Sequence, residues 1–148
     1  MTFPTPGTPV ELNQDGCIYL PHVFGVQTGQ TISIRNSDGL LHNIKATPTT
    51  NRPFNISQPT NMTTPRSFSE AETGVHLQCN VHSWMSAYVS VRPDPYFAVT
   101  GNDGTFSIRR LPPGTYEVEA WHESMPAQTQ SVTVAASESK EITFTFRR

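Results

Sequence analysis

The sequence predicts an all-β protein, namely a β-sandwich followed by a smaller β-sheet module. Short segments rich in β-branched and aromatic residues recur along the chain, and Gly, Pro, Asn and Asp separate them. No long stripe of apolar residues has a helical period. Two segments, Asn36-Ser37-Asp38-Gly39 and Asn102-Asp103-Gly104, have the composition of turns between strands.

Twelve short strands are expected, a number that suits a sandwich. They cover residues 17–19, 23–26, 31–36, 42–46, 66–68, 74–78, 87–91, 97–100, 105–109, 114–122, 128–134 and 140–146. Residues 47–64 are mostly Pro, Thr, Asn and Gln with little periodicity, which predicts a long surface loop. A short helical turn is expected near residues 54–58 within that loop.

Two prolines predict a boundary between domains. Arg92-Pro93-Asp94-Pro95 is rigid and forms strands poorly, so we expect one domain over residues 1–92 and a smaller one over residues 93–148. Beyond it, Leu111-Pro112-Pro113-Gly114 predicts a proline-set turn that leads into an alternating strand over residues 116–121.

The composition excludes several classes of function. The 148 residues carry a formal net charge of −2 and only 15% charged side chains, so no electrostatic footprint for nucleic acid is visible. No run of about 18 apolar residues predicts a membrane span. Residues 1–7 lack the basic and apolar regions of an export signal, and we interpret the chain as a mature or excised segment with a new start Met.

The strongest chemical signal is a loop that carries three metal ligands. Cys79, His82 and Met85 follow one another at intervals of three, so one tight turn offers a thiolate, an imidazole and a thioether. With one further histidine, this is the inventory of a blue-copper site. His42 is the candidate, because a Greek-key sandwich brings loops that are distant in sequence to one end.

Two other interpretations of these residues remain open. In the first, the loop holds no metal, its cysteine is buried, its histidine is solvated and its methionine fills the core. Two histidines and one cysteine also suit tetrahedral zinc, although a thioether is a poor zinc ligand and Met85 would then have no role. Copper uses all four side chains: a trigonal site with a long Met bond suits both Cu(I) and Cu(II), so little rearranges when an electron is transferred.

Residues 10–91 resemble the cupredoxin family, and the loop Cys79-x-x-His82-x-x-Met85 resembles its short, amicyanin-like form. The resemblance implies a Greek-key sandwich with His42, Cys79 and His82 as equatorial ligands and Met85 as the axial ligand of one type 1 copper ion. It implies two supporting roles for asparagines. The backbone N–H of Asn43 would donate to the sulfur of Cys79, and Asn36 would tie the two ligand loops together.

The rest of the chain, from residue 95 to about 146, resembles the carboxypeptidase-regulatory-like, transthyretin-like β module. The resemblance rests on Gly104-x-Phe106 and on Leu-Pro-Pro-Gly-Thr-Tyr at residues 111–116. The usual first strands of that module are not evident, so we expect it to complete itself by packing on the copper domain. Modules of this family are generally not catalytic, and bacterial exported proteins join these two halves.

Together these features predict a type 1 copper electron-transfer protein that cycles between redox partners, such as a cytochrome c or an oxidoreductase, and is not an enzyme. The alternative is a periplasmic copper-binding or copper-delivery protein with no carrier role, and a scaffold without copper is a third interpretation. A thiolate site that cycles favours the bacterial periplasm or exterior. The sequence assigns no role to Cys17 or His22 and no oligomeric state.

Overall fold

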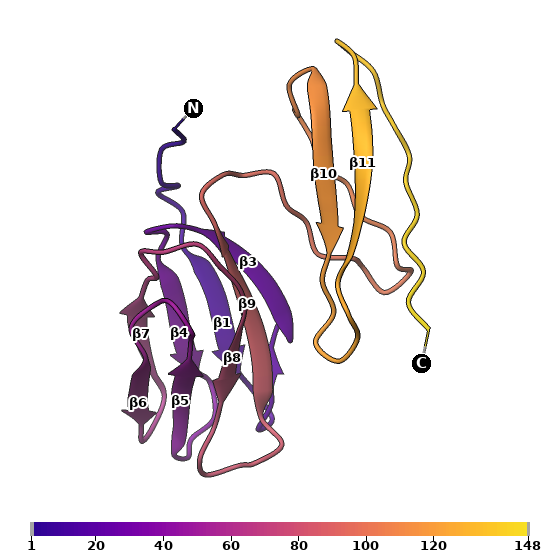
Figure 1. The fold of residues 1–148 in the computed structure, drawn as a ribbon. Coiled ribbons are helices and arrows are strands. Elements are labelled where there is room, and N and C mark those ends of the chain that lie inside the picture. The colour runs from indigo at the N-terminus through magenta and orange to yellow at the C-terminus, as the bar shows by residue number, and fades with distance from the viewer. Residues whose placement is uncertain (1, 148) are drawn as a thin grey trace.

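A computed structural model describes residues 2–147, and strands are the only regular elements that it contains there. Two sheets lie face to face, a five-stranded sheet in the order β3-β9-β8-β5-β6 and a four-stranded sheet in the order β2-β1-β4-β7 (Figure 1). A separate hairpin of β10 and β11 follows. The expected all-β sandwich with a smaller β module is therefore confirmed. No segment of residues 2–147 forms a helix with the length and apolarity needed to cross a membrane.

The strand bounds are β1 Val10–Gln14, β2 Tyr19–Leu20, β3 Val23–Gln27, β4 Ile32–Asn36, β5 His42–Thr47, β6 Phe54–Gln58, β7 Met62–Arg66, β8 Glu72–Gln78, β9 Ser86–Arg92, β10 Gly114–Ala120 and β11 Gln128–Val134. Alternating residues of the inner sandwich strands, chiefly β3, β4, β5, β8 and β9, point between the two sheets and form one apolar core. In β9, for example, Ala87, Val89 and Val91 are buried while their neighbours are not.

The strand pairing decides which residues meet at the end of the sandwich. β1 runs parallel to β4 and β3 runs parallel to β9, so the chain crosses between the sheets instead of forming only hairpins. β5 pairs with β8 antiparallel, with Lys45 opposite Gln78. The first residues of β5 therefore lie beside the residue that follows β8. This pairing brings His42 close to Cys79.

The strand predictions fail at the sheet edges and in the module. Residues 54–58 form β6 and residues 62–66 form β7, so the predicted helical turn and long loop are wrong there. Both strands lie at the edges of their sheets, where one side of the strand has no partner and Pro65 is tolerated. Such strands need little alternation of apolar and polar residues. The polar sequences of β6 and β7 therefore lack the pattern by which strands are predicted. Residues 10–14, which were not predicted, form β1.

Within the module, residues 97–100, 105–109 and 140–146 were predicted as strands but do not form ladders. Side chains hold the last of these segments beside the hairpin, because the Nε2 groups of Gln128 and Gln130 donate to the carbonyls of Thr145 (2.7 Å) and Thr143 (2.5 Å). The C-terminal segment thus lies along the hairpin without the regular backbone pairing of a strand.

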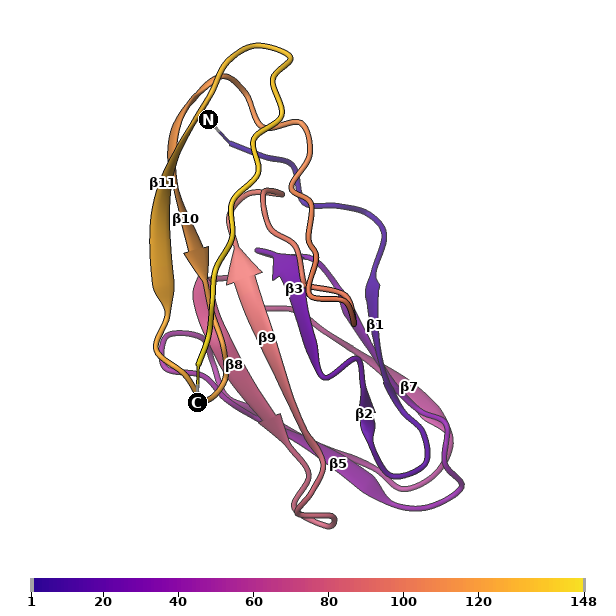
Figure 2. The same ribbon diagram turned by 90° about the vertical axis from the view of Figure 1, so that its right-hand side faces the viewer.

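The module packs on the five-stranded sheet at two glycines. The ring of Trp121 lies over Gly74 and the ring of Phe97 lies over Gly25, where an added Cβ would come within 2.5 Å and 2.6 Å of the rings. Figure 2 shows the β10–β11 hairpin beside β8 and β9. Because glycine lacks a Cβ, the aromatic rings of the module reach the backbone of the sheet.

One carboxylate closes the loop before β6, and it gives a pH-dependent prediction. Glu72 accepts N–H groups from Thr49, Thr50 and Asn51. Partial burial alone would raise its pKa, but these three donors outweigh that effect and lower the pKa below the usual 4.5. A lowered pKa in the folded state stabilises the protein above the unfolded-state pKa, and the contribution disappears as the pH falls through the folded-state value.

Glu72→Gln is therefore expected to lower the free energy of unfolding by about 1 kcal/mol at pH 7. Urea unfolding at several pH values measures the difference between the two proteins. That difference should begin to shrink below about pH 4.5, where the unfolded chain takes up a proton at Glu72, and should disappear at lower pH as the folded carboxylate is protonated. A difference that stays constant down to pH 3 would show that the charge of Glu72 is not what holds the loop.

Candidate metal centre

Three loops meet at the end of the sandwich that lies lowest in Figure 1. His42 is the first residue of β5, so the loop over residues 37–41 leads directly into it. Cys79 follows the last residue of β8, and Met85 precedes the first residue of β9. The third loop is the turn between β1 and β2, over residues 15–18.

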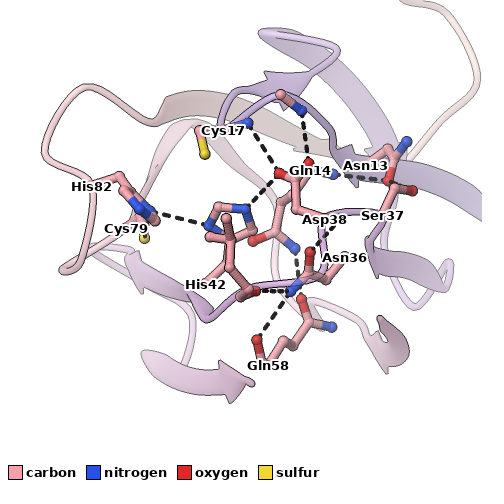
Figure 3. Close-up of polar contacts among 12 residues, drawn as sticks. Asn13, Gln14, Cys17, Asn36, Ser37, Asp38, His42, Gln58, Cys79 and His82 are labelled. Carbon is pink, nitrogen blue, oxygen red and sulfur yellow. Dashed lines mark hydrogen bonds and ion pairs between the residues drawn. The ribbon is translucent and has the colours of Figure 1, made fainter. Parts of the chain in front are cut away.

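The structure brings two predicted ligands against the third. The Nδ1 atom of His82 lies 3.1 Å from Nδ1 of His42 and 3.8 Å from the sulfur of Cys79 (Figure 3). His42 is fully buried and Cys79 is 4% exposed. Residues 42 and 79 come from distant parts of the chain, yet their donor atoms contact the same nitrogen.

Met85 ends the turn that carries Cys79 and His82. Its N–H donates to the carbonyl of His82 (3.1 Å), and its own carbonyl accepts the N–H of Cys79 (3.3 Å). The Met85 side chain is 1% exposed and belongs to the apolar core together with Cys79. The turn is thus closed on itself, and the thioether is buried in the same core as the thiol.

A carboxylate that was not predicted orients His42. The Nε2–H of His42 donates to Oδ2 of Asp38 at 2.7 Å, which leaves the lone pair of Nδ1 directed at His82. This hydrogen bond, followed by one from the N–H of Cys17, lowers the pKa of Asp38. Because its pKa is lowered from an ordinary value that is already far below 7, Asp38 is ionised at neutral pH and fixes the tautomer of the imidazole. The signal in the sequence is an acid four residues before a histidine.

Asp38→Asn is expected to weaken binding of the copper ion predicted from the sequence by about 10- to 100-fold, the usual cost of losing a group that orients a ligand. An amide oxygen still accepts from Nε2–H, but it lacks the charge that favours this tautomer. Competition with a chromophoric chelator measures the affinity. Asp15→Asn is the matched control, because Asp15 is exposed in the neighbouring turn. Equal affinities for the two variants would contradict the orienting role.

The two asparagines make contacts that differ in part from those expected. Asn36 Nδ2 donates to the carbonyls of Leu40 (2.9 Å) and Gln58 (3.0 Å), because Asn36 ends β4 next to the end of β6. It therefore fixes the first loop rather than tying the two loops together. Asn43 makes that link, since its side-chain oxygen accepts the N–H of Asn80 at 2.6 Å. The N–H contact from Asn43 to the sulfur stays a prediction.

A buried tyrosine lies next to Cys79 and the start of β5. The hydroxyl of Tyr19 donates to the carbonyl of Asn43 at 2.6 Å, and the ring is 3% exposed. Burial, and next to it the neighbouring Cys79, raises the pKa of Tyr19. The phenol therefore stays neutral, and its hydroxyl remains a hydrogen-bond donor to the carbonyl of Asn43, the residue after His42. Its burial contributes to the dry surroundings that tune a thiolate-bound metal.

The two residues without a role in the sequence analysis lie in different places. One ligand atom each of Cys17, His42 and His82 lie within 4.8 Å of one another, so Cys17 faces the site. His22 does not. Its Nδ1 lies 2.9 Å from the carbonyl of Ser86 and its Nε2 lies 2.6 Å from Oε1 of Glu123 in the module. It thus links the module to the sandwich.

The donors present fit copper. Two imidazole nitrogens, a buried thiol and a buried thioether are the mixed nitrogen and sulfur set of a blue-copper site. Zinc would leave the thioether of Met85 without a function. The carboxylate of Asp38 accepts a hydrogen bond from Nε2 of His42. It therefore orients the imidazole and is not itself a ligand.

Comparison with known proteins agrees with this architecture. Residues 85–147 match the family model of the carboxypeptidase regulatory-like domain, and that match begins just before β9. The sandwich is similar to a reduced tryptophan-to-tyrosine variant of amicyanin, with a TM-score of 0.52 and 16% identity over 60% of this chain and 86% of that one. A Cu(I) structure of a methionine-to-alanine variant of amicyanin gives a TM-score of 0.50 at 16% identity, over 56% and 81%.

A copper-containing nitrite reductase from Thermus scotoductus SA-01 gives a TM-score of 0.53 at 17% identity, over 59% of this chain. The match spans only 23% of the reductase chain. A search of the curated proteins found no significant match. The sandwich thus has the cupredoxin fold. The part of the chain that follows it, together with β9, matches the carboxypeptidase regulatory-like family model.

Proposed function

We propose that this protein is a type 1 copper protein that transfers single electrons, with His42, Cys79, His82 and Met85 as the ligands of one copper ion. One observation carries the proposal: donors from two distant loops, His42 and Cys79, both lie against Nδ1 of His82. When bound, copper supplies the Cu(I)/Cu(II) couple. The protein would hold the ligand atoms in place, keep water away from the metal and present a surface to a redox partner.

The hydrogen bonds around the site favour electron transfer because they limit rearrangement. Asp38 fixes one imidazole, the closed turn fixes Met85, and the contact of Asn43 with Asn80 joins the two ligand loops. A framework of this kind holds the donors in one geometry for both oxidation states. The reorganisation energy of each electron transfer is then small, because the ligands move little.

Exposed apolar side chains around the centre suit a redox partner. They are Ile18, Leu20, Leu40, Leu41, Val81 and Trp84. All of them lie in or next to the three loops that form the centre, and Trp84 is 62% exposed. Its ring lies 5.1 Å from that of His82. We propose His82 as the exit point for the electron and these side chains as the docking surface for an oxidoreductase or a cytochrome c.

The same proposal places the protein in the bacterial periplasm or outside the cell, and gives it no enzymatic activity of its own. Protein-film voltammetry with stopped-flow Cu(I) transfer to a chelator tests it. A carrier gives a reversible one-electron wave and releases Cu(I) slowly. An irreversible wave with fast Cu(I) release would instead support the alternative, a copper-delivery protein that uses the same ligands.

Met85→Leu is expected to keep copper and to raise the reduction potential. Leucine has a similar volume, so the buried turn is retained, whereas the weak axial sulfur donor that stabilises Cu(II) is lost. Voltammetry measures the potential and metal analysis measures the copper content. Loss of copper from a variant that is still folded would mean that Met85 is not a weak axial ligand.

A further inference from the structure

A second thiol lies at the metal centre. The ligating atom of Cys17 is within 4.8 Å of those of His42 and His82, which is close enough for all three to contact a common ion. Figure 3 shows the sulfur atoms of Cys17 and Cys79 both beside the pair of imidazole rings. Neither cysteine forms a disulfide, so both sulfurs are free to bind metal.

The backbone of the turn is held in the conformation that points Cys17 at the site. Gly16 and Cys17 both adopt left-handed backbone angles, with φ of 64° and 58°. Glycine adopts this conformation without strain, but at a cysteine it raises the conformational free energy by about 1 kcal/mol. A non-glycine residue in this region persists only where its surroundings hold it. The strain at Cys17 therefore requires specific contacts.

Those contacts come from both ligand loops. The carboxylate of Asp38 accepts the N–H groups of Gly16 and Cys17, each at 3.0 Å, with Oδ2 shared between Cys17 and His42. From the other loop, Nε1–H of Trp84 donates to the carbonyl of Cys17 at 2.7 Å. One carboxylate thus positions an imidazole and this cysteine together, and the turn is fixed to both loops of the centre.

We propose that Cys17 is a second thiolate ligand of the copper centre, which makes the donor set two cysteines, two histidines and a methionine. The inference rests on the proposed copper function. On binding, the thiol of Cys17 releases its proton to solvent and its sulfur forms a bond to the metal, with no change of oxidation state. A second negative sulfur stabilises Cu(II) more than Cu(I), so Cys17 lowers the reduction potential.

The test compares Cys17→Ser and Cys17→Gly with wild type, all loaded with copper. Serine keeps the size of the side chain, and glycine keeps the left-handed backbone without strain. X-ray absorption is expected to count two short copper–sulfur bonds in wild type and one in each variant. The variants should retain copper, shift the thiolate charge-transfer band and show a higher potential. Asp15→Asn, an exposed change two residues away, should match wild type.

A chemical readout separates ligation from simple proximity. Iodoacetamide labelling of the wild type, followed by peptide mass spectrometry, is expected to modify the half-buried Cys17 in the metal-free protein and to spare it once Cu(I) is bound. Unchanged labelling of Cys17 on Cu(I) binding would overturn its assignment as a ligand. So would one short copper–sulfur bond in wild type together with unchanged spectra of both variants, and the proposed function would then stand. A wild type that binds no copper would instead overturn the proposed function itself.

Discussion

Replacing Cys79 with serine is expected to remove most of the intense visible absorption of the oxidised, copper-loaded protein. The band arises from charge transfer between a thiolate and Cu(II), and a serine hydroxyl stays protonated at neutral pH. We also expect the affinity for Cu(I) to fall by more than about 100-fold, since losing a ligand costs at least as much as losing a group that orients one. Absorption spectra and chelator competition measure the two effects.

A residual band in Cys79→Ser would belong to Cys17, and the double variant with Cys17→Ser is expected to lose it. The metal-free Cys79→Ser protein must first show a cooperative thermal transition, because Cys79 is buried in the core. If this folded variant kept the full wild-type band, Cys79 would not be a ligand. The centre would then consist of Cys17 and the two histidines.

Gly74→Ala is expected to be the most destabilising of the single substitutions considered for the fold. Gly74 has a φ of 68°, where alanine costs about 1–2 kcal/mol. Its Cβ would lie 2.5 Å from Cζ2 of Trp121, so the ring or the backbone must move, at a further cost of about 1–3 kcal/mol. We therefore expect a loss of about 2–5 kcal/mol in the free energy of unfolding, measured with urea.

Gly104→Ala separates the two contributions. Gly104 has a φ of 80° and open space where the Cβ would lie, so only the conformational cost of about 1–2 kcal/mol is expected. The clash with the ring should also disappear in the background of Trp121→Ala, which makes the double variant less destabilised than the sum of its parts. Equal losses for Gly74→Ala and Gly104→Ala would show that Trp121 does not pack on β8 in solution.

Local spacing was enough to predict the donors of the proposed second ligand loop. Cys79, His82 and Met85 lie within seven residues, and the chemistry of their side chains makes them candidate ligands without knowledge of the fold. The prediction of His42 as a ligand also depended on the fold, because a Greek-key sandwich brings two distant loops together. The antiparallel pairing of β5 with β8 now gives the physical reason, because it places the start of one strand beside the end of the other.

Cys17 and Asp38 show where sequence reasoning ends. Cys17 reaches the site through a left-handed turn and a carboxylate from another loop, and neither leaves a periodic signal in the sequence. The role of Asp38 depends on which nitrogen of His42 faces inward, which only the geometry reveals. The edge strands β6 and β7 were missed for a related reason, since their pairing partners, and not their own composition, make them strands.

The proposed function requires a copper ion bound through a thiolate at the end of the sandwich. The visible and electron paramagnetic resonance spectra of the oxidised wild-type protein, taken with its copper content, test it most directly. We predict one copper per chain and an intense sulfur-to-copper charge-transfer band. Weak absorption and the resonance of ordinary tetragonal Cu(II), or no copper at stoichiometric loading, would rule out a thiolate-bound copper centre of this kind.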